Sequence, residues 1–220
     1  VNATRAGELL RRCAYPWQAL PELAKYISAR GGMLSAQGFE ERAPGVWIHR
    51  SARVAGTAQI DAPAIIDEGA EIRHAALIRG AVLIGRGCVV GNSTELKNCV
   101  LMDGAQAPHF NYVGDSILGR GAHMGAGAIA SNLRADGCAV RVSMGGARMD
   151  TGLRKLGAMI GDHAEIGCGA VLCPGAVLGR GACVYPLSMV RGLIPERHML
   201  KRDGSIVALR DMSDGGLQPL

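Results

Sequence analysis

The spacing of hydrophobic residues changes once along the chain, near position 47. Before that point, apolar residues recur at helical spacing, at Trp17, Leu20, Ala24 and Ile27. Consecutive glycines at positions 31 and 32 are typical of a helix end. Residues 1–46 are therefore expected to form a helical lead-in.

After that point, a large aliphatic residue stands at every sixth position. The first run comprises Ile48, Val54, Ile60, Ile66, Ile72, Ile78, Ile84, Val90, Leu96 and Met102. The second run comprises Ile160, Ile166, Leu172, Leu178, Val184 and Val190, and Leu118 and Met124 share a phase between the two. A period of six fits neither a helix nor an alternating strand, and it is the signature of a parallel β-helix solenoid.

The predicted fold is therefore all-β, a parallel β-helix of hexapeptide repeats with a short N-terminal helical segment. Three hexapeptides would make one triangular coil, with the aliphatic residues stacked inside and small residues at the corners. The composition agrees, because 32 of 220 residues are Gly while only two are Phe and two are Trp. Tight corners favour Gly, and a narrow interior leaves no room for large rings.

Two stretches break the period and are expected to leave the coil as loops, one near 105–115, which carries His109, and one near 133–158. The solenoid is expected to span 47–194, and residues 195–220, which lose the period, are expected to form a C-terminal cap. Loops that leave a packed coil are where function tends to lie.

Charge and cysteine content narrow the class of protein. The net charge of +5 comes from scattered Lys and Arg without interleaved aromatics, so no nucleic-acid partner is predicted. Seven cysteines without a Cys-x-x-Cys pair suit reduced, buried side chains better than a disulfide framework. No signal sequence or long apolar run is present, so a cytoplasmic protein without membrane contact is expected.

The segment 95–132, ELKNCVLMDGAQAPHFNYVGDSILGRGAHMGAGAIASN, closely resembles the acetyltransferase domain of the bifunctional N-acetylglucosamine-1-phosphate uridyltransferase/glucosamine-1-phosphate acetyltransferase. It is also similar to the C-terminal hexapeptide-repeat domains of sugar-phosphate nucleotidyltransferases. The resemblance implies a left-handed β-helix that assembles as a homotrimer with active sites between subunits. It also implies acetyl-CoA as co-substrate and no metal requirement. No Gly-rich nucleotide loop with a basic partner is seen, so no nucleotidyltransferase domain is expected.

The resemblance assigns catalytic roles to four positions. His109 matches the catalytic base, Glu95 would orient it, the Ala126 backbone amide would face the acyl oxygen, and Asn132 would close the acyl pocket. An amine attacks a thioester only as the free base, so a group that titrates near neutrality suits the role of His109. A fixed backbone amide could stabilise the oxyanion.

The resemblance also assigns binding positions. For the amino-sugar phosphate or nucleotide sugar these are Arg79, Lys97, Tyr112 and His123. For the coenzyme they are Ala126, Gly127 and Asn132, and Arg191 in the last coil is a further candidate. Cationic side chains are the expected anchors for a phosphate.

Two departures from the family keep other functions open. His123 replaces an Asn that contacts the sugar, and Leu133 replaces a Tyr. The first hypothesis is an acetyl-CoA-dependent N-acyltransferase acting on an amino-sugar phosphate or nucleotide amino sugar. The second is a catalytically silent solenoid that binds a nucleotide sugar. The third is a zinc enzyme of the γ-carbonic-anhydrase type, although the histidines lack that family's close pair.

Overall fold

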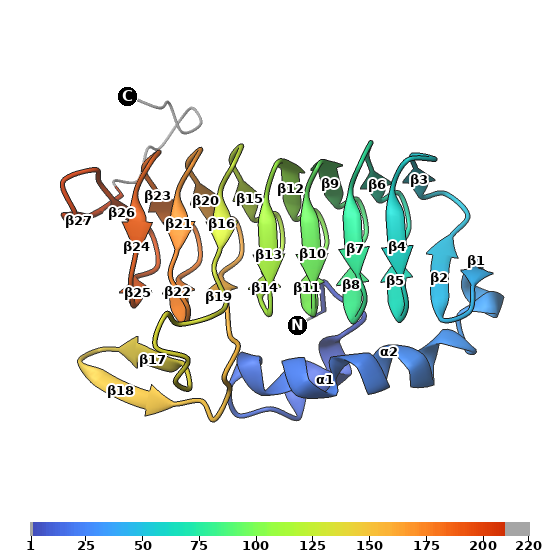
Figure 1. The fold of residues 1–220 in the computed structure, drawn as a ribbon, viewed down its shortest axis with the longest axis horizontal. Coiled ribbons are helices and arrows are strands. Elements are labelled where there is room, and N and C mark those ends of the chain that lie inside the picture. The colour runs from blue at the N-terminus through green and yellow to red at the C-terminus, as the bar shows by residue number, and fades with distance from the viewer. Residues whose placement is uncertain (1, 210–220) are drawn as a thin grey trace.

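The computed structural model describes residues 2–209 as a three-sided parallel solenoid with helices along one side (Figure 1). The expected parallel β-helix of hexapeptide repeats with a short N-terminal helical segment is confirmed. Of the cap expected at 195–220, positions 210–220 lie outside the described residues. Residues before 210 continue the coil in β26 (His198–Leu200) and turn back in β27 (Ile206–Ala208).

Three sheets form the three faces of the solenoid. Sheet A contains β1 (Phe39–Ala43), β2 (Val46–His49), β5 (Ala64–Ile66), β8 (Val82–Ile84), β11 (Cys99–Leu101), β14 (Ile117–Leu118), β19 (Ala158–Ile160), β22 (Ala176–Leu178) and β25 (Leu193–Ile194). Sheet B contains β3 (Arg53–Val54), β6 (Glu71–Ile72), β9 (Val89–Asn92), β12 (Gln106–His109), β15 (His123–Met124), β20 (Glu165–Ile166), β23 (Cys183–Val184), β26 and β27. Sheet C contains β4 (Gln59–Asp61), β7 (Leu77–Arg79), β10 (Glu95–Lys97), β13 (Tyr112–Gly114), β16 (Ile129–Ala130), β21 (Val171–Leu172) and β24 (Met189–Val190).

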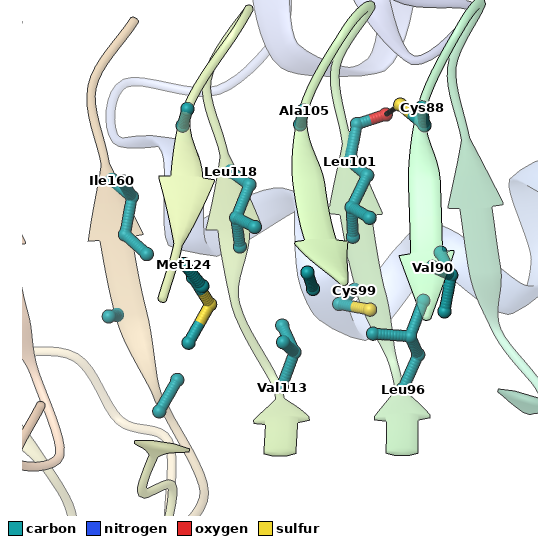
Figure 2. Packing of buried hydrophobic residues seen from close by; sticks show 14 of the residues in the cluster. Cys88, Val90, Leu96, Cys99, Leu101, Ala105, Val113, Leu118, Met124 and Ile160 are labelled. Atoms are coloured by element: carbon teal, nitrogen blue, oxygen red, sulfur yellow. Dashed lines mark hydrogen bonds between the residues drawn. The ribbon is translucent and has the colours of Figure 1, made fainter. Parts of the chain in front are cut away.

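The coil interior is a continuous column of aliphatic side chains. Figure 2 shows Val90, Leu96, Leu101 and Met124 pointing into it from neighbouring strands. Each inner residue faces its counterpart one coil away, because the strands pair in parallel register along each sheet. Burial of such side chains is worth about 1.5–3 kcal/mol each, which offsets the cost of ordering the chain.

The expectation of a loop near 105–115 is wrong. That segment forms β12 and β13, which pair with the coils on both sides. Two successive coils are shortened to a 17-residue offset, seen from Asn98 to Asp115 and from there to Asn132. As a result Leu101, fully buried, takes the inner position expected for Met102, which is half-buried.

Sheet A is buried on both faces. Its outward residues Trp47, Ile65, Leu83, Val100 and Ile117 form a second core with the N-terminal segment. That segment comprises α1 (Gly7–Arg11), η1 (Pro16–Glu22), α2 (Leu23–Gly31) and η2 (Ser35–Gln37), and it runs along the solenoid in Figure 1. Strands covered on both sides read as continuous apolar runs, which accounts for the Ala-Ile-Ile and Val-Leu-Ile triplets of β5 and β8.

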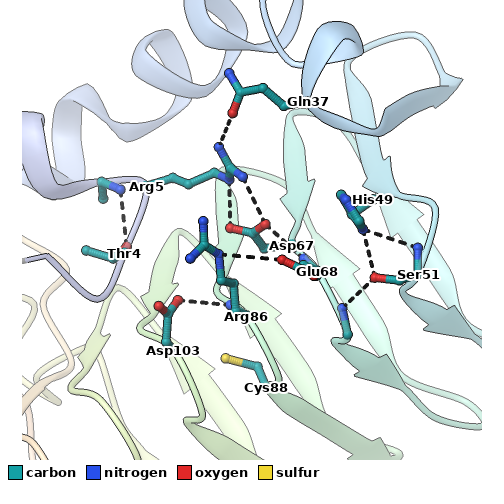
Figure 3. Close-up of polar contacts among 12 residues, drawn as sticks. Thr4, Arg5, Gln37, His49, Ser51, Asp67, Glu68, Arg86, Cys88 and Asp103 are labelled. Atoms are coloured by element: carbon teal, nitrogen blue, oxygen red, sulfur yellow. Dashed lines mark hydrogen bonds and ion pairs between the residues drawn. The ribbon is translucent and has the colours of Figure 1, made fainter.

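An ion pair fastens the N-terminal segment to the coil (Figure 3). Arg5 donates from Nε to Oδ2 of Asp67 at 2.6 Å and from Nη1 to Oε1 of Gln37 at 2.7 Å. Asp67 is almost completely buried, so its charge needs this partner. The Arg5 guanidinium also lies 4.7 Å from the centre of the Phe39 ring. The helical segment is therefore part of the folded unit.

The stretch at 133–157 leaves the coil between β16 and β19. It contains the antiparallel hairpin of β17 (Arg141–Met144) and β18 (Ala147–Asp150). Val140, Val142 and Leu156 are buried in the second core beside Met159 of sheet A. The hairpin therefore extends the cover of sheet A beyond the N-terminal helices.

All seven cysteines are free, and burial raises the pKa of Cys88 to about 12. The thiol donates to the Met102 carbonyl at 3.0 Å inside the coil. Among residues 2–209, no helix has the length and apolar character needed to cross a membrane.

We expect Leu83→Ala to lower the free energy of unfolding by about 2–5 kcal/mol, because it opens a cavity between sheet A and the N-terminal helices. Denaturant unfolding followed by circular dichroism measures the change. Met33→Ala, at a side chain that is 70% exposed, is the matched control and should stay within about 0.5 kcal/mol. Equal effects of the two variants would contradict a second core over sheet A.

Candidate functional site

The outer face of sheet C brings together four of the residues expected to bind or act. Glu95 and Tyr112 stand opposite each other in β10 and β13, and Lys97 ends β10. Arg79 ends β7, the next strand along, and donates from Nη1 to Oε1 of Glu95 at 2.7 Å. Side chains of one strand row point the same way, so residues 17 or 18 apart in sequence become neighbours. Arg79, Glu95, Lys97 and Tyr112 are called the sheet C cluster below.

A corner of the coil beside this cluster holds a ladder of three polar side chains. Asn98 donates from Nδ2 to Oδ1 of Asp115 at 2.8 Å, and Asn132 donates from Nδ2 to Oδ2 of Asp115 at 2.5 Å. Lys97 Nζ lies 3.8 Å from Oδ2 of Asp115. Asp115 is only 5% exposed. The corner therefore ties a buried carboxylate to groups from the coils before and after it.

Tyr112 connects the ladder to the sheet C cluster. Burial and the nearby Glu95 carboxylate raise the pKa of its phenol, and a hydrogen bond with Asn132 opposes the rise. The Asn132 amide nitrogen therefore lies close to both the Asp115 carboxylate and the Tyr112 hydroxyl. A Cβ at Gly114 would meet the Tyr112 hydroxyl and Asn132 Nδ2 at 2.6 Å each, so glycine permits this approach.

His109 lies at the end of β12, on the corner between sheets B and C. Its backbone amide donates to Oδ1 of Asn111 at 3.1 Å, and its carbonyl accepts from the Gly127 amide at 3.0 Å. The Asn111 side chain is buried and donates to the carbonyls of Gly125 and Ala128. The imidazole is exposed, and no partner to it is found among residues 2–209.

The turn of Ala126 and Gly127 stacks directly on this corner. Gly127 has a φ of +71°, and its amide donates a hydrogen bond to the His109 carbonyl. The Ala126 amide donates to no acceptor in the described part of the chain, whereas its carbonyl accepts from Gly169. One backbone N–H beside His109 is therefore available to a ligand.

Three expected arrangements do not occur within the chain. Glu95 is paired with Arg79 instead of orienting His109. His123 lies on sheet B, where Nδ1 contacts Oε2 of Glu165 at 2.9 Å, on a different face from the sheet C cluster. Arg191 follows β24, which is three strands from β13 and so about 14 Å along the sheet. Two residues of one sequence motif can therefore lie on different faces of the solenoid.

Sequence reasoning missed Asp115 and Asn98. Both have φ of +46°, an uncommon conformation that Asn and Asp tolerate better than most residues. The signal available in the sequence was the equal spacing of Asn98, Asp115 and Asn132, which becomes readable once the coil length there is known to be 17 residues.

No group of three or more His, Cys, Asp or Glu side chains suited to a metal ion is found in residues 2–209. His74 contacts Thr57 at 2.8 Å, and His123 contacts Glu165. The histidines are thus dispersed over the solenoid in the single chain.

The chain is similar to one family model and to several curated proteins. Residues 60–147 match the family described as the GMPPB C-terminal domain. A relative from Sulfurisphaera tokodaii, named bifunctional sugar-1-phosphate nucleotidylyltransferase/acetyltransferase, is 42% identical over 98 residues, which are 44% of this chain and 24% of the relative. Bifunctional protein GlmU from Methanococcus vannielii is 33% identical over 121 residues, or 54% and 29%.

The chain thus spans between about a quarter and a third of the length of these curated relatives. The resemblance to the hexapeptide-repeat part of nucleotidyltransferase/acetyltransferase proteins, expected from segment 95–132, is confirmed.

Solved structures of hexapeptide-type transferases are more distant. A mutant of AntD, an N-acyltransferase from Bacillus cereus solved with dTDP and coenzyme A, has a TM-score of 0.42 and 17% identity over 74% of this chain and 84% of its own. PerB from Caulobacter crescentus, solved with CoA and GDP-perosamine, has a TM-score of 0.31 and 19% identity over 73% and 56%.

The His123–Glu165 contact predicts a measurable pH effect. The hydrogen bond to Glu165 raises the pKa of His123, while burial opposes the rise. In Glu165→Gln the pKa should therefore fall toward the ordinary value of 6.5, as measured by NMR titration of the ring protons.

The sign of the stability effect follows from the raised folded-state pKa. The pair stabilises the fold fully below the ordinary histidine pKa and loses that effect as pH rises through the raised value. The stability gap between the native chain and Glu165→Gln should hence be larger at about pH 5.5 than at about pH 8.5. Glu68→Gln, which removes a carboxylate elsewhere, should leave the His123 titration unchanged. A gap that grew with pH would contradict the assignment.

Proposed function

We propose that the chain is an acetyl-CoA-dependent N-acyltransferase whose acceptor is the amine of an amino-sugar phosphate or a nucleotide amino sugar. The observation that carries the proposal is the stacking of Arg79, Lys97 and Tyr112 on one face, next to the corner that presents His109. The same residues lie within 60–147, the stretch that matches the family described as the GMPPB C-terminal domain.

In this proposal His109 is the general base. Its exposed imidazole removes a proton from the acceptor amine as the amine nitrogen bonds to the thioester carbonyl carbon. The carbon–sulfur bond then breaks, and the coenzyme leaves as a thiol that takes up a proton. The Ala126 amide, which has no acceptor in the described chain, supports a role in stabilising the oxyanion.

The cationic side chains supply the acceptor anchors. Arg79 and Lys97 would bind the phosphate, with the Tyr112 hydroxyl as a further donor. Glu95 holds the Arg79 guanidinium through one nitrogen, which leaves other donors of the group for a ligand. Glu95 therefore acts on Arg79 in this proposal instead of orienting His109. Asn132 would close the acyl side of the site.

We further propose a homotrimer in which a second copy covers the outer face of sheet C. Sheet A is already covered by the N-terminal helices and the hairpin. Sheet C presents an outward row of Ile129, Val171 and Met189, which are 38%, 36% and 59% exposed. An aligned apolar row of this kind favours burial against another surface.

The catalytic proposal is tested by thiol release from acetyl-CoA in the presence of amino-sugar phosphates or nucleotide amino sugars. His109→Ala should lower kcat/KM by about 100- to 10,000-fold, because general base catalysis is lost. His74→Ala, at another exposed histidine, whose Nδ1 contacts Thr57, is the matched control and should retain full activity. Unchanged turnover in His109→Ala would overturn the mechanism. Binding of a nucleotide sugar without transfer to any amine would instead favour a silent binding solenoid.

The assembly proposal is tested by light scattering after size-exclusion chromatography. Val171→Asp places a charge in the apolar row and should convert the trimer to smaller species, because a buried unpaired carboxylate is costly. Gln59→Asp, in the same outward row at the polar end of sheet C, should leave the trimer intact. A monomeric native chain would contradict the assembly.

A further inference from the structure

The buried carboxylate of Asp115 contacts three side chains, those of Lys97, Asn98 and Asn132. The same corner position in the two preceding coils also lies in the left-handed region, with φ of +50° at Ala81 and +46° at Asn98. Asp115 shares this conformation and differs in placing a carboxylate where only 5% of the residue is exposed. Burial of a carboxylate costs free energy, so it calls for a compensating role.

The partners of Asp115 come from the coil before it and the coil after it. Asn98 and Asn132 each donate one amide hydrogen to a different carboxylate oxygen, at 2.8 and 2.5 Å. Lys97 lies at 3.8 Å from Oδ2 and supplies the opposite charge. The Asp115 backbone amide donates to the Lys97 carbonyl at 2.9 Å. A carboxylate accepts hydrogen bonds only, so it dictates which end of each amide faces it.

The acceptor-only character of the Asp115 carboxylate determines how the Asn132 amide is oriented. Because Asp115 can only accept, the Asn132 nitrogen faces inward, where it also meets the Tyr112 hydroxyl. Its Oδ1 has no donor among residues 2–209 and is left to accept from a ligand. Were the amide to flip, the oxygen would face the carboxylate and the pair would repel.

The Asn132 backbone is fixed as well. Its carbonyl accepts from the Leu156 amide at 2.9 Å, where the 133–157 excursion returns, and the Asp115 carbonyl accepts from Gly157 at 2.8 Å. The excursion thus leaves the coil after Asn132 and returns to it beside Asp115, and these two residues are joined by a side-chain hydrogen bond.

We propose that Asp115 is a positioning residue, which fixes the orientation of the Asn132 amide so that Oδ1 faces the acyl donor. This inference rests on the proposed acyltransferase function. Asp115 touches no substrate in this account and acts through Asn132.

The test compares two glycine variants at matched positions. Asp115 and Asn98 both have φ of +46°, so glycine is tolerated at each and adds similar flexibility to the unfolded chain. Asp115→Gly removes the carboxylate that accepts from Asn132. Asn98→Gly removes the Asn98–Asp115 hydrogen bond and leaves the Asn132–Asp115 hydrogen bond in place. Asp115→Asn is a third variant of equal size that keeps the backbone conformation but lacks the charge.

Below the melting temperature of every variant, Asp115→Gly and Asp115→Asn should lower kcat/KM for acetyl-CoA by about 10- to 100-fold. KM for the acceptor should change less. Asn98→Gly should stay within about threefold of the native chain for both substrates. An equal loss of activity in Asn98→Gly and Asp115→Gly would overturn the positioning role. Full activity in both Asp115 variants would overturn it as well.

Crystal structures of the native chain and the same variants give a readout that does not depend on turnover. The Asn132 side chain should rotate or lose order in both Asp115 variants and keep its place in Asn98→Gly. An unmoved Asn132 in Asp115→Gly would overturn the inference even if the enzyme is active. Absence of acetyl transfer by the native chain would instead count against the proposed function, and the position of Asn132 in the variants would then decide the anchoring by itself.

Discussion

Parallel hydrogen bonding between successive coils is the constraint on which the other features of this chain depend. The parallel strands of the coils are two to four residues long, so no single coil could hold its shape alone. Stacking one coil on the next pairs the backbone groups of both and aligns the inner side chains in columns. A residue can be added or removed only at a corner, since a change within a strand would shift the register of every coil that follows.

The same constraint determines how the candidate site is assembled. A residue on an outer face has its nearest neighbours one coil before and one coil after, so Arg79, Glu95 and Tyr112 meet although they are far apart in the chain. No loop has to fold over to create this juxtaposition. The excursion at 133–157 leaves the coil at a corner and returns to it beside Asp115, so its hairpin adds cover to sheet A without breaking the ladder.

Much of the fold could be predicted from the sequence, because interior positions of a solenoid accept only aliphatic residues and the six-residue period is visible directly. The prediction failed where the period changed. Ala107 occupies an inner position without the bulk that would mark it. Loss of one residue between Leu96 and Leu101 moves the inner position from Met102 to Leu101, and a second loss before Leu118 moves it again. The coil around His109 was therefore mistaken for a loop.

The candidate site was predictable to a different degree. The family resemblance identified Arg79, Lys97 and Tyr112, and these residues do lie together. It could not assign a face to His123 or a partner to Glu95, because an outward side chain in a three-sided coil can belong to any of three surfaces. Asp115 escaped notice because its role depends on residues 17 positions away on either side.

The outer face of sheet C changes character along the solenoid, and the candidate site lies at the change. Toward the N-terminal coils the face carries Arg79 and Glu95, and toward the C-terminal coils it carries Val171 and Met189. In the single chain the Arg79–Glu95 pair is partly exposed, with side-chain exposures of 47% and 30%, so water screens its charges and the pair adds little stability.

In the proposed trimer a partner surface on the apolar row would exclude water from its edge. Charges there would act on a bound phosphate through a lower effective dielectric, where a given separation gives a stronger interaction. Placing the cationic side chains at the border of an apolar row therefore links ligand binding to assembly. If the charges and the apolar row lay at opposite ends of the solenoid, assembly would not change the dielectric around the bound phosphate.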